Sequence, residues 1–264
     1  MDGFVNVNGL DMRVRTAGQG PRRVIFVHAL GADADLWEDV AQRMPAGIGS
    51  VRYDLRGHGE TAVTPAPYTL RQLSGDLLAL MDALDITRAT ICGISIGGLI
   101  AQQAALDAPD RVESLILCNT ALRIGSAEGW QARMDAVASR GLADMADEIT
   151  ARWYAPSFPA HAPERAADLR RRLAGMSAVG YIGACAALRD GDLRNDSPAI
   201  ISPTLVVSGS ADIAAPSVQG RELAAAIPHA KFAEVAGAGH LPCIEDPAAL
   251  AALIESFLME TNVV

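Results

Sequence analysis

Strand-like and helix-like patterns alternate along most of this 264-residue chain, and that alternation restricts it to α/β folds. The first two strand-like runs, 4–7 and 12–16, frame Asn8-Gly9, a dipeptide typical of a tight β-hairpin. Leucines at helical spacing follow Thr69, which we expect to cap a helix over 69–84. The other expected strands are 23–27, 51–54, 89–93, 112–119, 203–209 and 231–235, and the other expected helices are 96–107, 217–227 and one after Pro247.

The alternation stops between residues 121 and 195, where helical patterns continue with little strand signal. This stretch holds two of the three tryptophans, and its ten arginines against nine carboxylates give it a net charge of +1. The rest of the chain carries −10, for a total of −9. Because the strand pattern then resumes, we interpret 121–195 as a helical insertion in a core domain formed by 1–120 and 196–264.

Composition and charge exclude several classes of protein. A net charge of −9 offers no basic excess to neutralise phosphates, so we expect no nucleic-acid partner. No apolar run approaches the ~18 residues that span a bilayer, and the first residues lack the pattern of a secretory signal. We therefore expect a cytoplasmic protein with no membrane partner. The four cysteines have no CxxC spacing, and we expect buried free thiols: Cys92, Cys118, Cys185 and Cys243.

Ser95 lies in Gly93-Ile94-Ser95-Ile96-Gly97, which follows an expected strand and precedes an expected helix. So sharp a turn needs glycine where a side chain would strike the neighbouring strand or helix. The turn leaves the hydroxyl clear of the sheet, beside a helix N-terminus that favours a developing oxyanion. We interpret Ser95 as a candidate nucleophile. The alternative is a glycine-lined turn with an incidental serine.

A serine nucleophile needs a base, and the chain has five histidines. His240 lies in the loop GAGHLPCIEDP, between the last strand and the last helix, and we expect it to be the base. The alternative for His240 is a histidine that only caps its loop. We expect His28 and His58 to shape the turns in which they lie, and His161 and His229 to lie at the surface.

The base in turn needs an acid. Asp212 follows the strand at 203–209, and the order Ser95, Asp212, His240 is the one expected on such a sheet. The alternative for Asp212 is an aspartate that only forms a turn. The rival acid position, after the strand at 112–119, holds Asn119, whose amide cannot stabilise an imidazolium as a carboxylate does.

An oxyanion hole needs two backbone donors near the nucleophile. We expect one to be the N–H of Ile96, directly after Ser95. We expect the other to be the N–H of Leu30, in the loop "HALG" that follows the strand at 23–27.

The motifs HALG, YDLRGHG, GISIG, GSAD and GAGHLPCIEDP together resemble those of the α/β-hydrolase superfamily over nearly the whole chain. The resemblance implies a mostly parallel eight-stranded sheet flanked by helices, with a helical lid inserted after the sixth strand. In the insertion, the segments RWYAPSF and YIGACAALRDGDLR look like those of 3-oxoadipate enol-lactonases. That likeness implies hydrolysis of 3-oxoadipate enol-lactone in aromatic catabolism, with no cofactor and no metal.

The substrate of that family carries a carboxylate, which an acidic protein must bind at a locally cationic place or through well-placed hydrogen bonds. We expect Trp130 and Arg133, three residues apart on one helix face, to line the pocket together with Trp153. The alternative is that the tryptophans pack inside the insertion and the arginine is solvated. The run 170–172 of three arginines indicates a solvated helix face.

Two other functions stay open at this point. A carboxylesterase, another lactonase or a carbon–carbon bond hydrolase would use the same three residues on a different small substrate. A ligand-binding protein could keep them on a hydrolase scaffold with little catalysis. The sequence indicates no particular oligomeric state.

Overall fold

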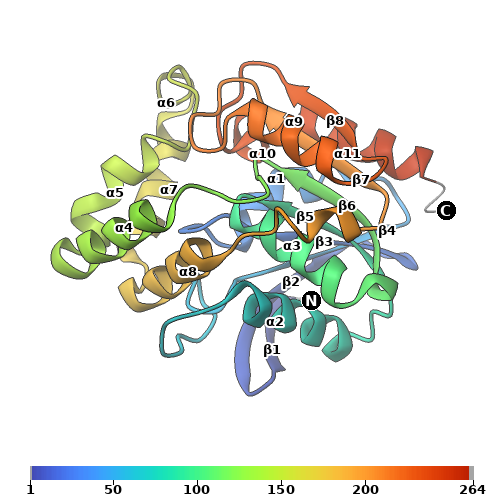
Figure 1. Cartoon of the computed structure of the whole chain (residues 1–264), viewed down its shortest axis with the longest axis horizontal. Coiled ribbons are helices and arrows are strands. Elements are labelled where there is room, and N and C mark those ends of the chain that lie inside the picture. The colour runs from blue at the N-terminus through green and yellow to red at the C-terminus, as the bar shows by residue number, and fades with distance from the viewer. Residues whose placement is uncertain (1, 262–264) are drawn as a thin grey trace.

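The computed structural model describes residues 2–261, and their strands form an eight-stranded sheet with the order β1-β2-β4-β3-β5-β6-β7-β8 (Figure 1). The strands are β1 (Asp2–Val7), β2 (Leu10–Ala17), β3 (Arg22–Val27), β4 (Ile48–Tyr53), β5 (Ala89–Ile94), β6 (Val112–Cys118), β7 (Thr204–Gly209) and β8 (Lys231–Val235). β2 pairs antiparallel with β1 and β4, and the other pairings are parallel. Asn8 and Gly9 both have positive φ, as a two-residue hairpin turn requires. The predicted mostly parallel sheet is confirmed.

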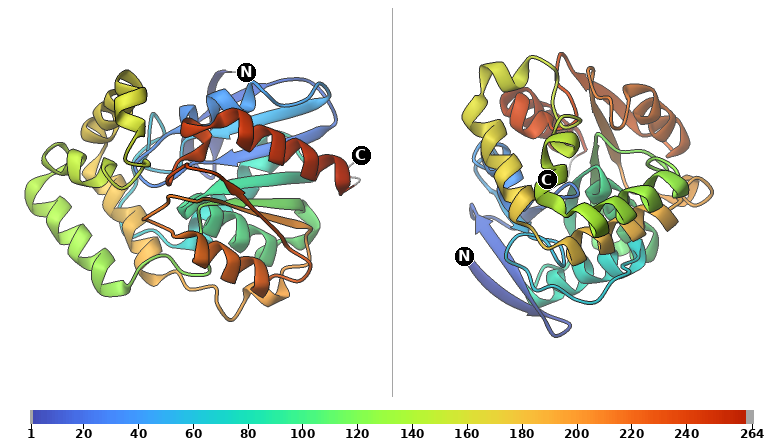
Figure 2. Two further views of the ribbon diagram at one scale, coloured as in Figure 1. Left: turned by 90° about the horizontal axis from the view of Figure 1, so that it is seen from above. Right: turned by 90° about the vertical axis from the view of Figure 1, so that its left-hand side faces the viewer.

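Helices cover both faces of the sheet. Around the core they are η1 (Ala34–Trp37), α1 (Glu38–Ala41), α2 (Leu70–Ala83), α3 (Ile96–Asp107), η2 (Pro109–Arg111), η3 (Ser197–Ala199), α9 (Ser217–Ala226), α10 (Pro242–Glu245) and α11 (Pro247–Glu260). α1 and α11 pack together on one face, and α2, α3 and α9 lie on the other (Figure 2). The hydroxyl of Thr69 accepts a hydrogen bond from the N–H of Gln72 at 3.1 Å, so the predicted cap is present. Within residues 2–261, no helix is long and apolar enough to cross a membrane.

The core lies between the sheet and these helices. Its largest fully buried side chains include Trp37 and Phe26, whose ring centroids are 5.1 Å apart. The four cysteines are also buried and free, as the sequence predicts. Burial of this apolar surface is the main favourable contribution to the stability of the fold.

Five helices between β6 and β7 form the predicted insertion: α4 (Ala127–Arg140), α5 (Leu142–Thr150), α6 (Phe158–His161), α7 (Pro163–Gly175) and α8 (Ala178–Asp190). They project to one side of the sheet (Figure 1). α8 rests directly on the core, because glycines allow the two to approach closely. A Cβ on Gly180 would overlap the carbonyl of Gly57, and a Cβ on Gly183 would lie 2.6 Å from the ring of Tyr68.

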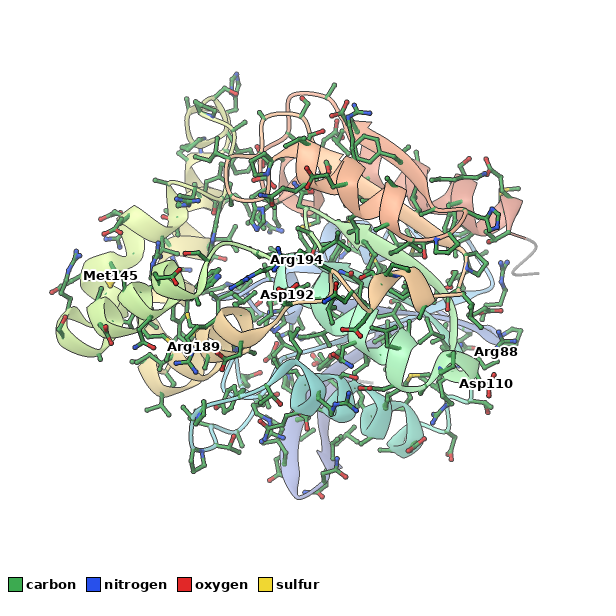
Figure 3. All side chains as sticks on the ribbon, viewed as in Figure 1. Arg88, Asp110, Met145, Arg189, Asp192 and Arg194 are labelled. Carbon is green, nitrogen blue, oxygen red and sulfur yellow. The ribbon has the colours of Figure 1, made fainter. Side chains whose placement is uncertain are left out.

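The two connections of the insertion lie side by side where they leave the core. The N–H of Leu193 donates to the carbonyl of Leu122 at 2.9 Å, and Arg123 lies 3.5 Å from Asp192. Asp192 also pairs with Arg194 in the segment that returns to the core (Figure 3). The hydrogen bond from Arg194 lowers the pKa of Asp192 to about 2. These contacts close the base of the insertion.

The arginine run in α7 is largely solvated, as expected: Arg171 and Arg172 are exposed and Arg170 is half-buried. Arg170 and Arg171 pair with carboxylates of the insertion itself. Arg172 instead reaches the core, where its Nη1 lies 3.0 Å from Asp33 Oδ2 and 2.9 Å from Asp35 Oδ2. These ion pairs tie α7 to the loop after β3. The partners are 139 and 137 positions apart in the chain, so local sequence gave no sign of them.

The junction between β5 and α3 needs glycine, because β3 passes very close to it. A Cβ on Gly93 would overlap the carbonyl of Gly97. A Cβ on Gly97 would overlap the carbonyl of Val27 and lie 2.9 Å from that of His28. The first turn of α3 can therefore pack against the end of β3 only if position 97 has no side chain.

We expect Gly97→Ala to lower the free energy of unfolding by roughly 1–3 kcal/mol, since the atoms it strikes are backbone atoms that cannot rotate away. Gly75→Ala in α2 is the matched control. Nothing lies within 4 Å of a Cβ on Gly75, so alanine there should stabilise the helix by roughly 0.5–1 kcal/mol. Urea unfolding followed by circular dichroism measures both changes. A Gly97→Ala variant as stable as the wild type would contradict the close contact.

Candidate active site

Ser95 directly follows β5 and has φ 57° and ψ −121°, a backbone conformation that costs a non-glycine residue about 1–3 kcal/mol. Two hydrogen bonds hold it there. Its N–H donates to the carbonyl of Cys118 at 3.0 Å, and its own carbonyl accepts from the hydroxyl of Thr120 at 2.8 Å. Because α3 begins at the next residue, the serine stands at the positive end of a twelve-residue helix.

His240 and Asp212 form a hydrogen-bonded pair, with 2.8 Å between Nδ1 of the ring and Oδ2 of the carboxylate. The other oxygen, Oδ1, accepts from the N–H groups of Ala214 at 2.7 Å and Ala215 at 3.1 Å. A carboxylate facing Nδ1 requires the proton to lie on that nitrogen. Nε2 of His240 is then free of a proton and can accept one from a serine hydroxyl.

Asn119, the rival acid position in the sequence, lies against the same carboxylate. Its Nδ2 donates to Asp212 Oδ2 at 2.8 Å and to the carbonyl of Gly239 at 3.1 Å. Burial acts to raise the pKa of Asp212, but the hydrogen bond and charge of His240 and the donor of Asn119 outweigh it and lower that pKa. Asp212 is thus ionised at neutral pH, and Asn119 supports it instead of replacing it.

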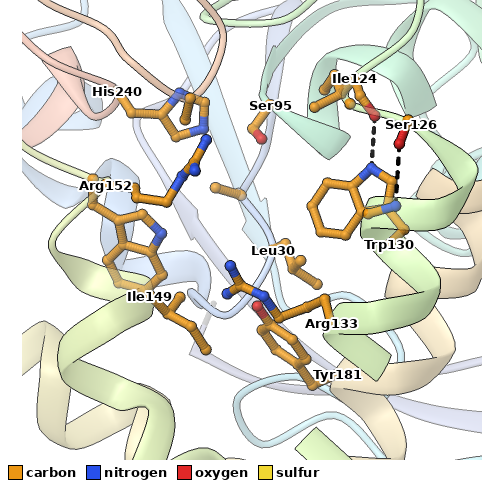
Figure 4. A pocket seen from close by; sticks show the side chains of 15 residues that line it. Leu30, Ser95, Ile124, Ser126, Trp130, Arg133, Ile149, Arg152, Tyr181 and His240 are labelled. Atoms are coloured by element: carbon orange, nitrogen blue, oxygen red, sulfur yellow. Dashed lines mark hydrogen bonds between the residues drawn. The ribbon is translucent and has the colours of Figure 1, made fainter. Parts of the chain in front are cut away.

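Ser95 and His240 both face a cavity of about 230 Å³ between the core and the insertion (Figure 4). Trp130, Arg133 and Trp153, the three residues expected in the pocket, all line it. The indole N–H of Trp130 donates to the carbonyl of Ile124 at 2.6 Å, which fixes the ring in the wall. The further lining residues are Ala29, Leu30, Ile124, Gly125, Ser126, Gly129, Ile149, Arg152, Tyr181 and Ala214.

Three polar residues of this cavity were missed in the sequence: Ser126, Arg152 and Tyr181. Arg152 precedes Trp153 directly, so its proximity to that tryptophan was the available signal. Tyr181 carries no comparable signal, because only the packing of α8 brings it to the wall. Burial raises the pKa of the Tyr181 phenol, and Arg133, which hydrogen-bonds with its hydroxyl, opposes that rise. Neither Arg133 nor Arg152 forms an ion pair with a carboxylate in the part of the chain that the structure describes.

The two candidate oxyanion donors belong to different segments, one directly after Ser95 and one in the loop after β3. Ile96 is the first residue of α3, so its N–H has no acceptor within the helix. Leu30 lines the cavity in the loop after β3. His28 supports that loop from inside the core: its Nε2 accepts from the N–H of Leu55 at 2.9 Å, and its Nδ1 lies 2.8 Å from the carbonyl of Ala29. Burial lowers the pKa of His28, so the ring is neutral and structural.

The remaining histidines lie where the sequence suggests. His58 is fully buried, its ring centroid 5.3 Å from that of His28, and burial lowers its pKa to about 3. A histidine that stays neutral inside the core suits the expected structural role. His161 and His229 are exposed.

Glu245 links the histidine loop to the insertion, and nothing in the sequence singled it out. Its Oε1 accepts from the N–H of Gly239 and its Oε2 from the N–H of Ala155, each at 2.9 Å. A third bond runs beside them, from the N–H of Leu241 to the carbonyl of Trp153 at 3.1 Å. The backbone around His240 and the pocket wall around Trp153 therefore form one hydrogen-bonded unit.

Comparison with known proteins agrees with this architecture. The model of the α/β-hydrolase fold family matches residues 22–247. The chain is 36% identical to 3-oxoadipate enol-lactonase 2 of Acinetobacter baylyi, over 94% of this chain and 92% of that protein. The crystal structure of the enol-lactonase from Burkholderia xenovorans LB400 superposes with a TM-score of 0.94 at 37% identity, covering 97% of this chain and 99% of that one.

A more distant structure, a thermophilic esterase from Thermogutta terrifontis solved with malate bound, superposes with a TM-score of 0.92 at 26% identity, covering 99% of each chain. The fold is thus shared by a lactonase and an esterase among these structures. The enol-lactonases named here and 3-oxoadipate enol-lactonase 1 of Acinetobacter baylyi are 34–37% identical to the chain over nearly its full length. The chain belongs to the α/β-hydrolase fold family and, within it, is a homologue of the 3-oxoadipate enol-lactonases.

Proposed function

We propose that this protein is a serine hydrolase that opens 3-oxoadipate enol-lactone, a lactone bearing a carboxylate, to 3-oxoadipate in aromatic catabolism. The observation that carries the proposal is the cavity itself, in which a serine and an Asp-supported histidine face an arginine that has no carboxylate partner among the described residues. Near-full-length similarity to enol-lactonases supports this choice of substrate over other esters.

In this proposal Ser95 Oγ attacks the lactone carbonyl while Nε2 of His240 removes its proton. Asp212 holds the ring in the required tautomer and stabilises the imidazolium that forms. The negative oxygen of the tetrahedral intermediate rests on the N–H groups of Leu30 and Ile96. One such donor typically contributes roughly 3–4 kcal/mol of transition-state stabilisation.

Collapse of the intermediate breaks the bond to the ring oxygen and releases an enolate, which takes up a proton and tautomerises to the ketone. The chain remains attached to Ser95 as an acyl ester. His240 then activates a water molecule, which cleaves that ester and restores the serine. The net reaction adds one water, and the residues named need no cofactor to perform it.

The pocket wall supplies the rest of the specificity in this proposal. Arg133 would bind the substrate carboxylate through charge-assisted hydrogen bonds, with Trp130 and Trp153 enclosing the ring. Residues 121–195 would act as a lid that keeps water from the site. The overall charge of −9 and the four free thiols support the proposal that the enzyme is cytoplasmic, acts on a small molecule and binds no nucleic acid.

We expect Ser95→Ala to abolish turnover of the enol-lactone, followed by its ultraviolet absorbance, because no other nucleophile stands at the elbow. Ser139→Ala, an exposed change on α4, is the control and should keep wild-type rates. A plain p-nitrophenyl ester run in parallel tests the substrate. Efficient cleavage of the ester by the wild type, with none of the lactone, would leave a serine hydrolase but refute the enol-lactonase.

We expect Asp212→Asn to lower kcat roughly 10⁴-fold, as loss of the orienting carboxylate does in comparable triads. Both carboxylate oxygens accept from N–H groups, so either orientation of the amide places its NH₂ against a donor and disturbs His240. Steady-state kinetics on the lactone measure the change. Asp110→Asn, at an exposed position, is the control. A loss of less than tenfold would argue against Asp212 as the acid.

We expect Arg133→Ala to raise KM for the lactone roughly 10- to 100-fold, because hydrogen bonds to a charged group are lost, while a neutral ester keeps its KM. Arg140→Ala, at the exposed end of the same helix, serves as the matched control. An unchanged KM for the lactone in the Arg133 variant would show that the carboxylate is bound elsewhere.

A further inference from the structure

The arginines of the insertion divide into two groups by their partners. Eight of the ten form ion pairs with carboxylates of the described chain. The two that do not are Arg133 and Arg152, and both line the cavity above Ser95. The protein is acidic, and the other arginines of the insertion all have carboxylate partners. Two cations without such partners at one cavity therefore indicate a ligand with more than one negative charge.

The two guanidinium groups reach the cavity from different walls. Arg133 extends from α4 to a position beside Tyr181 in the lower part of the view, whereas His240 lies at the top (Figure 4). Arg152 lies in the turn after α5 and points toward the imidazole of His240 in the same view. Arg152 therefore lies at the end of the cavity where the lactone is cleaved, and Arg133 lies at the far end.

Hydrolysis of a carboxylate-bearing lactone raises the number of negative charges on the ligand from one to two. Water adds its oxygen to the acyl carbon, the bond from that carbon to Ser95 Oγ breaks, and a proton returns to Oγ through His240. The acid so formed has an ordinary carboxylic pKa and ionises at neutral pH. Its carboxylate appears at the carbon that Ser95 attacked, beside His240, whereas the original carboxylate lies at the other end of the molecule.

We propose that Arg152 binds the carboxylate that hydrolysis creates, so that the cavity holds a linear dicarboxylate between Arg133 and Arg152. The inference rests on the proposed function, which supplies the reaction. It adds dicarboxylates as a ligand class, whereas the substrate carries only one carboxylate. Charge-assisted hydrogen bonds at both ends favour a dicarboxylate over a monocarboxylate of equal length. The diacid product, and unreactive dicarboxylates of similar length, therefore inhibit the enzyme competitively.

The test compares inhibition by adipate and by hexanoate, which have the same chain length but two carboxylates and one. p-Nitrophenyl acetate, which has no carboxylate, serves as the reporter substrate at constant ionic strength. We expect adipate to bind the wild type roughly tenfold more tightly than hexanoate, from one additional charged contact. Arg152→Gln keeps a polar side chain without the charge, and it should reduce this ratio to about one or two.

Arg170→Ala is the matched control, since Arg170 is an insertion arginine that pairs with Asp147 outside the cavity, and it should retain the wild-type ratio. The ratio compares two inhibitors on one preparation, so it does not depend on the fraction of folded enzyme. An unchanged ratio in Arg152→Gln, or an equal loss in Arg170→Ala, would overturn the inference. Failure of the wild type to cleave the lactone, with the ratios as expected, would refute the proposed function and leave a dicarboxylate site.

Discussion

The carboxylate of Asp212 joins the three loops that form the catalytic edge of the sheet. Its four donors come from Asn119 after β6, from Ala214 and Ala215 after β7, and from His240 after β8. These bonds keep the acid ionised although it is buried, because each favours the charged form. The ionised acid in turn fixes the tautomer of His240. The position of three loops and the chemistry of the base thus depend on one charged group.

The insertion is bonded to two of the loops at this edge, the one after β3 and the one that carries His240. Arg172 pairs with Asp33 in the loop after β3 and with Asp35 in η1, and Glu245 accepts from the N–H groups of Gly239 in the histidine loop and Ala155 in the insertion. The N–H of Leu241 donates to the carbonyl of Trp153, so this wall residue of the cavity is bonded to the loop that carries His240. The insertion is therefore bonded directly to the loop after β3 and to the loop that carries His240.

Local sequence predicted the elements whose causes are local. The helix 96–107, the cap at Thr69 and the hairpin at Asn8-Gly9 depend on residues within a few positions of each other, and all three are present. The contacts of Arg172 and Asn119 join residues about 90 to 140 positions apart, and periodicity contains no record of such pairs. Motifs led us to expect Ser95, Asp212 and His240 in one site; Asp212 and His240 are hydrogen-bonded, and Ser95 and His240 line the same cavity. The places of Arg152 and Tyr181 in the cavity wall depend on the packing of α5 and α8.

The net charge of the protein does not determine how an anion is bound in the cavity. At physiological salt a charge is screened beyond ~8 Å, so the net −9 of the chain scarcely affects an anion inside the cavity. The charges close to such an anion determine how strongly it is bound. Without Arg133 and Arg152 the insertion has eight arginines against nine carboxylates, and its surface is close to neutral. The two arginines of the insertion that lack a carboxylate partner among residues 2–261 therefore both lie at the cavity, Arg133 half-buried and Arg152 exposed.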